Sequence, residues 1–278
     1  MKRCHDSFRS TRLVVALLGV CGLSPLAQAA GPAVSNPAGK VSLQGGDLNG
    51  KDASSADGAL TLPIGQLFGL QVDASSGRFL DRSYRGLGGH AFWRDPDQGL
   101  AGITSAYQKL GDQGNRRNGA EGELYLDRYT VILRAGEQTG DGPHGAYEGV
   151  GLRWYLTQNL SLNLGFDHSP GVVNTTGIGV EWQPVRWGVP GLALFARGTH
   201  SVANDQIGDS HAVSVGVRYY FGAPKSLMTH HRTDDPDSIV MPLGDVIPTP
   251  TIIPAPPPAP VPAVVTPPPA PVVTPPPD

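Results

Sequence analysis

The stretch from His211 to Gly222, HAVSVGVRYYFG, alternates between apolar and polar side chains without a break. One side of the alternation carries Val213, Val215, Val217, Tyr219 and Phe221. A period of two residues is the pattern of a β-strand with one apolar face. Another 56 residues follow, most of them unsuited to a sheet or a core. The stretch therefore predicts the last strand of a fold that ends near Phe221.

The same alternation recurs every 10 to 20 residues in the middle of the chain, where no sustained apolar helical spacing is found. The fold class predicted is all-β, with about twelve strands. The alternative is ten strands, if the first two runs lie outside the sheet. The runs cover residues 40–46, 59–65, 68–74, 86–94, 99–108, 122–126, 129–136, 147–156, 160–168, 176–182, 192–198 and 211–222.

Residues 1–29 have the order of a secretory signal peptide: basic residues, the apolar run LVVALLGVCGL (13–23), then Ala-Gln-Ala at 27–29. The run of eleven apolar residues is much shorter than the roughly 20 that a spanning helix needs. Cys4 and Cys21 would be removed with the signal, which excludes disulfides and thiolate metal sites. The remaining 17 basic and 23 acidic side chains do not provide the basic surface of a nucleic-acid-binding protein.

Composition divides the rest of the chain into four parts. Residues 30–40 form a small-residue leader, 41–222 carry the predicted strands, 223–247 form a polar linker, and 248–278 form a tail with 15 Pro. Proline fixes φ and removes a backbone donor, so the tail should be an extended polyproline II spacer without a core. Such a spacer could reach on the order of 90 Å at its rise per residue.

The predicted connections alternate between long polar segments and short turns, which is typical of an outer-membrane β-barrel. A soluble β-sandwich is the alternative, because it also has many short alternating strands. Aromatic residues at the strand ends favour the barrel, since bilayer interfaces select two aromatic belts. The predicted belt residues are Trp93, Tyr107, Tyr129, Trp154, Phe166 and Trp182.

The other face of the predicted strands is too polar for a dry core and suits a barrel lumen. The predicted lumen-facing residues are Asp73, His90, Glu123, Arg134, Arg153, Asp167, Glu181, Arg197 and Arg218. The four arginines could form a basic strip that favours anionic solutes. They could instead pair with the lumen-facing carboxylates and close the barrel, which the availability of opposite charges slightly favours.

Residues 41–222 resemble the small outer-membrane β-barrel proteins of Gram-negative bacteria. In that family the last strand ends in Phe after alternating apolar residues and is the signal for barrel assembly, and the last strand here, 211–221, matches. Gly222 and the tail depart from the common pattern, a departure shared by OmpA-like members with a periplasmic extension. The resemblance implies an outer-membrane location, lipid contacts and recognition by the barrel-assembly machinery. With an even strand count both termini leave on the short-turn side, so the tail should enter the periplasm, where a passive spacer is favoured over a contact with peptidoglycan or a periplasmic protein.

Chemical motifs are weak, and the sequence predicts no catalytic residue, metal ion or cofactor. Asp167-His168-Ser169 and His200-Ser201 combine hydrolase residue types, but neighbours in a strand point to opposite faces. His230 and His231 with Asp234, Asp235 and Asp237 could gather a cation, although a solvated linker is favoured. The function predicted is a small porin-like channel for small polar or anionic solutes. The alternatives are a structural or adhesive envelope protein with a plugged barrel and, third, an outer-membrane lipid hydrolase.

Overall fold

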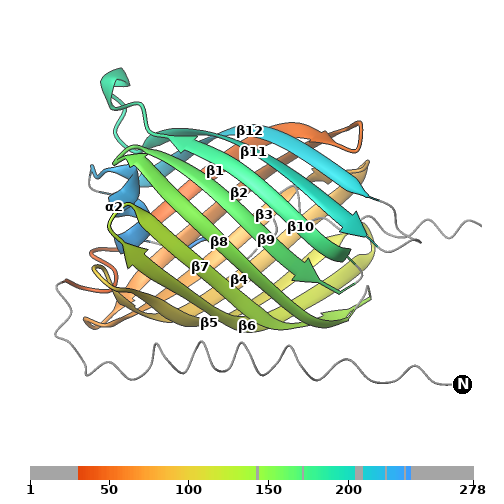
Figure 1. The fold of residues 1–278 in the computed structure, drawn as a ribbon, viewed down its shortest axis with the longest axis horizontal. Coiled ribbons are helices and arrows are strands. Elements are labelled where there is room, and N and C mark those ends of the chain that lie inside the picture. The colour runs from red at the N-terminus through yellow and green to blue at the C-terminus, as the bar shows by residue number, and fades with distance from the viewer. Residues whose placement is uncertain are drawn as a thin grey trace, which may run out of the picture.

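A computed structural model describes residues 31–141, 144–170, 172–203, 209–222, 224–234 and 236–238. The predicted signal peptide, most of the polar linker's second half and the Pro-rich tail lie outside the described residues. Twelve strands pair antiparallel in sequence order, and β1 pairs with β12 to close the barrel (Figure 1). The prediction of an all-β, twelve-strand antiparallel barrel is confirmed.

The strands are longer than the alternating runs that predicted them. Their bounds are β1 (Ala38–Leu48), β2 (Lys51–Ile64), β3 (Phe68–Phe79), β4 (Arg82–Asp95), β5 (Gly99–Leu110), β6 (Gln113–Leu126), β7 (Tyr129–Gly140), β8 (Gly145–Thr157), β9 (Leu160–Ser169), β10 (Val172–Trp182), β11 (Leu192–Ala203) and β12 (Ser210–Phe221). A 3₁₀ turn, η1 (Val185–Trp187), and a short helix, α2 (Leu227–Thr233), complete the described elements.

The outer face of the barrel carries an apolar band that stops before one end of the strands. On β9, the outward residues from Leu160 to Phe166 are all apolar, and the next outward residue is His168. On β12 the outward residues from Val213 to Phe221 are apolar, and His211 lies at the other end. Large exposed apolar side chains on a closed sheet fit contact with lipid, as in outer-membrane barrels.

The expected long polar connections are instead parts of strands. β1 and β2 are joined by residues 49–50, β3 and β4 by 80–81, and β5 and β6 by 111–112. Asn49, Leu80 and Asp81 have positive φ, as such tight hairpins require. The strands continue past the apolar band, where water can reach the outer face, so polar side chains there do not interrupt pairing. The connection 183–191, at the opposite end, is longer than any of these three.

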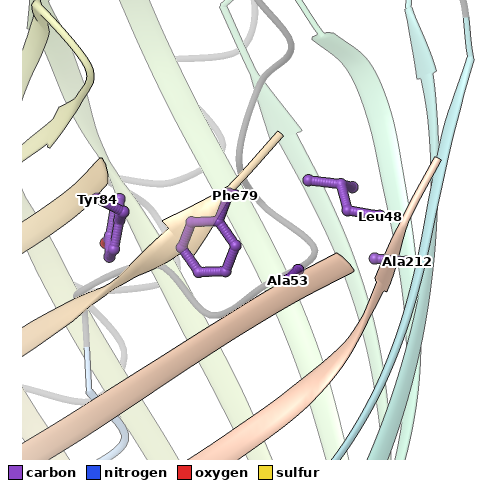
Figure 2. Packing of buried hydrophobic residues seen from close by; sticks show 5 residues of the cluster. All are labelled: Leu48, Ala53, Phe79, Tyr84 and Ala212. Atoms are coloured by element: carbon purple, nitrogen blue, oxygen red, sulfur yellow. The ribbon is translucent and has the colours of Figure 1, made fainter. Parts of the chain in front are cut away.

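An apolar cluster fills part of the lumen near these tight turns, which we call the far end. Figure 2 shows Leu48, Ala53, Phe79, Tyr84 and Ala212, which come from β1, β2, β3, β4 and β12. The Phe79 and Tyr84 rings meet edge to face, with centroids 5.0 Å apart. This cluster occupies the far end of the lumen beside β1 to β4.

The two segments that flank the barrel cover its other end, which we call the α2 end (Figure 1). Val34, in the predicted leader, packs with Phe92 and Leu100. Leu227, the first residue of α2, packs with Ala193 and Tyr220. The Ser35 amide donates to the Thr233 carbonyl at 3.3 Å and so joins the two segments. In the described part of the chain, no helix is long and apolar enough to cross a membrane.

Candidate functional site in the barrel lumen

A cavity of about 210 Å³ lies in the lumen beside β8, β9 and β10. Its wall there consists largely of glycines that face inward: Gly149, Gly151, Gly165, Gly177 and Gly179. An inward glycine adds no side chain to the lumen, so the sheet leaves this space open. The apolar cluster at the far end lies across the lumen, beside β1 to β4. The cavity extends to residues of β1 and β2, such as Ser42 and Asp57, whereas the apolar cluster fills the lumen at the far end.

Arg218, on the inward face of β12, forms a buried ion pair with Glu181 of β10. Its Nη1 donates to Glu181 Oε2 at 2.7 Å, and its Nε donates to Ser42 Oγ at 3.0 Å. The Tyr220 hydroxyl donates to the other Glu181 oxygen at 2.8 Å. The pair between Arg218 and Glu181, one of those considered from the sequence, is thus present.

Arg153 and Arg134 pair with an acid that does not come from a strand. Arg153 Nη2 donates to both Asp237 carboxylate oxygens, at 2.6 and 2.8 Å, and Arg134 Nη2 lies 3.5 Å from the carboxylate. Loss of water around the Asp237 carboxyl opposes its ionisation. The guanidinium groups of Arg153 and Arg134 and the Lys40 ammonium outweigh this effect and hold the pKa of Asp237 well below its usual range.

The backbone beside Asp237 also contacts the opposite wall of the barrel. The Pro236 carbonyl accepts hydrogen bonds from Lys40 Nζ at 3.3 Å and from Gln71 Nε2 at 3.2 Å. Lys40 belongs to β1 and Gln71 to β3, whereas Arg153 belongs to β8. Residues 236–238 therefore lie across the lumen, and Asp237 and Ser238 both line the cavity.

Helix α2 is anchored to the α2 end of the barrel mainly through polar contacts. The His231 ring nitrogens lie 3.1 Å from the Tyr155 hydroxyl and 2.9 Å from the Tyr220 hydroxyl. The Met228 amide donates to the Gln158 carbonyl at 3.0 Å. Burial and the nearby Arg153 charge lower the pKa of His231 to about 4, although Glu181 acts in the opposite direction.

Residues 224–234 and 236–238, which we call the C-terminal segment, differ from the solvated linker that the sequence predicted. His230 and His231 are buried, and His230 pairs with Asp234 at 2.7 Å and stacks on Tyr220. Lys225 also pairs with Asp234. The segment is docked because its polar side chains find partners in the barrel mouth. Among the described residues, no group of three or more His, Cys, Asp or Glu side chains is placed to hold a metal ion.

The remaining predicted lumen residues fall into two groups. Asp73 and His90 lie deep in the lumen, where His90 Nε2 is 2.8 Å from Asp73 and Nδ1 is 2.7 Å from Glu121. Glu123, on the inward face of β6, is also buried. Asp167 and Arg197 instead line the cavity, together with Arg134, Arg153, Glu181 and Arg218.

Several charged groups of the lumen were not predicted from the sequence, among them Lys40, Asp57, Glu121 and Asp237. Asp57 and Glu121 precede the alternating runs 59–65 and 122–126. The predicted strands therefore began after these residues, whereas β2 and β6 include them. The alternation of β6, continued backwards by one position of the inward face, would have found Glu121. Nothing in the local sequence around Asp237 indicates that it lies in a lumen.

Two apolar residues that interrupt the polar lumen lie over inward glycines of neighbouring strands. A Cβ atom at Gly69 would collide with the Phe92 ring, and one at Gly216 would collide with the Phe195 ring. Arg94 and Arg218 lie over these two rings, at 4.8 and 4.9 Å from the centroids. Each phenylalanine ring thus packs on the backbone of a neighbouring glycine and makes a cation–π contact with an arginine.

The predicted belt residues and the alternate apolar residues of β12 lie on the outer face. Tyr129 and Trp154 stack with centroids 6.1 Å apart, and Trp182 meets Trp187 of η1 edge to face at 5.7 Å. Trp93 is half-buried on the same face, and Tyr107 and Phe166 are exposed. The outward residues of β12 are Val213, Val215, Val217, Tyr219 and Phe221.

The adjacent hydrolase residue types are separated by the barrel wall. His168 is exposed on the outer face of β9, whereas Asp167 lines the cavity inside. His200 is exposed on β11, and its neighbour Ser201 is buried and hydrogen-bonded to Thr175 at 2.8 Å. Neither sequence pair forms a nucleophile and base in contact.

No family model matches the chain, and no curated protein matches it. Many solved structures match the chain, among them two of the KdgM porin. One is described as the KdgM porin, with a TM-score of 0.52 and 9% identity, and the match covers 66% of this chain and 99% of that one. The other is the KdgM porin in complex with disordered oligogalacturonate, with a TM-score of 0.51, 10% identity and the same coverage. The chain therefore has the fold of an outer-membrane β-barrel.

Proposed function

We propose that this protein is a porin-like channel of the outer membrane for small polar or anionic solutes. The observation that carries the proposal is the cavity inside a closed barrel whose outer face is apolar. A continuous sheet with an apolar exterior and a charged interior separates lipid from a wet path. The likeness in fold to the KdgM porin supports the same class of function.

The charge of the cavity wall favours anions. The lining contains five basic residues, Lys40, Arg134, Arg153, Arg197 and Arg218, and four acidic ones, Asp57, Asp167, Glu181 and Asp237. Asp237 does not belong to a strand. The barrel wall itself therefore presents five basic and three acidic side chains, which is a net charge of +2. Rings and strips of basic side chains favour anionic solutes in pores.

Conductance of the purified protein in planar lipid bilayers tests the channel. The chain should give stepwise currents with anion preference, and the double variant Arg134→Gln, Arg197→Gln should lose that preference. Arg116→Gln is the matched control, because Arg116 is exposed on the outward side of β6. Silence from protein that is folded, as shown by heat-modifiable gel mobility, would contradict the proposal.

The second candidate is a structural envelope protein with a plugged barrel. The C-terminal segment favours it, because Asp237 and Ser238 lie in the lumen and α2 covers one end. Under this alternative the currents would be absent in the intact chain and in every cavity variant. We propose no enzymatic activity, since neither hydrolase-like residue pair forms a reactive contact.

Export and partners complete the proposal. Residues 1–29 would direct export, and the last strand, β12, would be recognised by the barrel-assembly machinery through its alternating apolar residues. The Pro-rich residues 248–278 would serve as a periplasmic tail that contacts peptidoglycan or a periplasmic protein. Deleting the side chain of Phe221 (Phe221→Ala) should reduce the amount of barrel in the outer membrane, measured by gel mobility of membrane fractions.

A further inference from the structure

The pair formed by Arg153 and Asp237 has the geometry of a carboxylate-binding site. One guanidinium nitrogen of Arg153 reaches both carboxylate oxygens, at 2.6 and 2.8 Å. A second guanidinium, on Arg134, lies 3.5 Å from the same carboxylate. Charge-assisted contacts of this kind are the strong ones in proteins, and guanidinium groups are frequent partners of carboxylates.

A contact within the barrel wall orients Arg153. Arg153 Nε donates to Asn163 Oδ1 at 2.7 Å, and Asn163 belongs to the adjoining strand β9. This contact fixes the plane of the guanidinium and leaves its outer nitrogen directed at Asp237. Arg153 and Arg134 also line the cavity, so a solute in the cavity meets the same two cations.

The contacts that hold the Asp237 carboxylate are ones that a solute could also make. The side chain is 31% exposed, and its partners are cations that a solute carboxylate could satisfy equally well. The neighbouring Pro236 carbonyl accepts two hydrogen bonds, of 3.2 and 3.3 Å, from the opposite wall. Replacement of Asp237 by a free carboxylate therefore leaves no arginine unpaired.

We propose that Arg153 and Arg134 form a carboxylate-binding subsite for the solute, and that Asp237 occupies this subsite in cis and lowers the open fraction of the channel until a carboxylate displaces it. The inference rests on the proposed channel function, of which it specifies the ligand chemistry and the regulation. A ligand that binds only the displaced state shifts the population towards that state. Because Asp237 is tethered nearby, it acts at an effective concentration on the order of millimolar or more, and displacement requires solute in that range.

The first arm of the test compares two variants of the full mature chain in planar bilayers. Asp237→Asn removes the carboxylate of the C-terminal segment, whereas Asp57→Asn removes one carboxylate of a strand that lines the same cavity. Both variants change the cavity charge by +1. Asp237→Asn should raise the open fraction at least tenfold, and Asp57→Asn should leave it within twofold of the unchanged chain. Equal effects of the two variants would overturn the inference, because cavity charge alone would explain them.

The second arm uses gluconate as a carboxylate probe and sorbitol as a polyol of similar size without a carboxylate. Millimolar gluconate should raise the open fraction of the unchanged chain and should have no further effect on Asp237→Asn. Sorbitol should have no effect on either protein. A gluconate response that is equally large in Asp237→Asn would contradict displacement of Asp237.

The two proposals fail in different ways. If the unchanged chain and both variants are silent although folded, the channel function itself is wrong. If all three conduct alike and gluconate changes nothing, the channel stands and the cis-acting Asp237 is wrong. If Asp237→Asn alone opens and gluconate opens the unchanged chain, both proposals are supported.

Discussion

Arg153 donates hydrogen bonds of 2.6 and 2.8 Å to Asp237, a residue that lies beyond the end of the last strand. Part of the positive charge of the barrel wall is thus neutralised by the C-terminal segment rather than by a facing strand. A pair that is formed within the wall, such as Arg218 with Glu181, is fixed when the barrel closes. A pair formed with a tethered segment can open while the barrel stays intact.

Acidification should loosen helix α2. His231 contacts Tyr155 and Tyr220 and lies 3.7 Å from Glu181. The charges of Arg153 and Asp237 also affect its pKa. Its pKa is lowered to about 4 in the docked state, against an ordinary value of about 6.5 when undocked. Between pH 4 and pH 6.5 the His231 ring is protonated when α2 is undocked and neutral when α2 is docked. Docking is therefore fully stable above pH 6.5 and weakens as the pH falls. At pH 5 the loss is on the order of 2 kcal/mol.

A spin label on α2 reports the loosening of the helix as increased label mobility. The chain from residue 31 onward contains no cysteine, so Thr229→Cys, on the exposed side of the helix, provides a single labelling site. Label mobility should rise between pH 7 and pH 5 and return on neutralisation. In a His231→Gln background the same pH range should leave mobility unchanged. A pH response that persists in that background would show that another group controls docking.

The inward glycines should determine the size of the cavity. A Cβ atom at Gly179 would lie 3.5 Å from the Ala196 carbonyl and 3.7 Å from Asn163 Cβ, which are ordinary contacts. Gly179→Leu should therefore fold and should lower single-channel conductance severalfold by filling the lumen. Gly198→Leu is the matched control, because Gly198 adjoins Ile178 on the outward face of β11. Equal conductance of the two variants would show that ions do not pass beside β10.

The strands that carry large apolar residues on one face were predictable from sequence, and the polar parts of strands were not. β12 was expected at 211–222 and spans Ser210–Phe221, because its alternation continues to both ends. β2 and β6 begin with polar residues on both faces, where water contacts either side and no alternation is required. Asp57 and Glu121 lie in those parts, which explains why they were missed.

Long-range contacts account for the rest of what the sequence could not predict. Helix α2 has the sequence LMTHHRT, which lacks an apolar stripe, and its buried residues are Leu227, His230 and His231. Polar residues in such a segment are normally solvated. Here they dock because Tyr155 of β8, Tyr220 of β12 and Asn159 of the turn between β8 and β9 present partners at the same place. These three residues come together only when the barrel closes, and a local sequence pattern does not predict which residues closure brings together.

The pair between Arg218 and Glu181 should contribute strongly to stability once formed. The two side chains are 16% and 7% exposed, so removing one leaves a largely buried charge without its partner. Arg218→Met should lower the free energy of unfolding by about 3 to 5 kcal/mol, and the double variant Arg218→Met, Glu181→Leu should lower it by less. Urea unfolding in lipid vesicles measures both values. A loss in the double variant that equals or exceeds the loss in Arg218→Met would contradict this expectation.

The outer face should be embedded in lipid, with its tryptophans near one interface. The chain has four tryptophans, at 93, 154, 182 and 187, and all four lie at the α2 end of the barrel, on strand ends or in η1. Trp154, Trp182 and Trp187 are exposed on the outside, as expected for side chains that contact the headgroup region. Fluorescence in vesicles should be quenched by lipids brominated near the headgroup and less by lipids brominated near the chain ends. Trp187→Phe should reduce the quenching, because Trp187 of η1 is expected to lie in the headgroup region. Tryptophans that no brominated lipid quenches would show that this face is not in a bilayer, and the proposed membrane channel would be wrong.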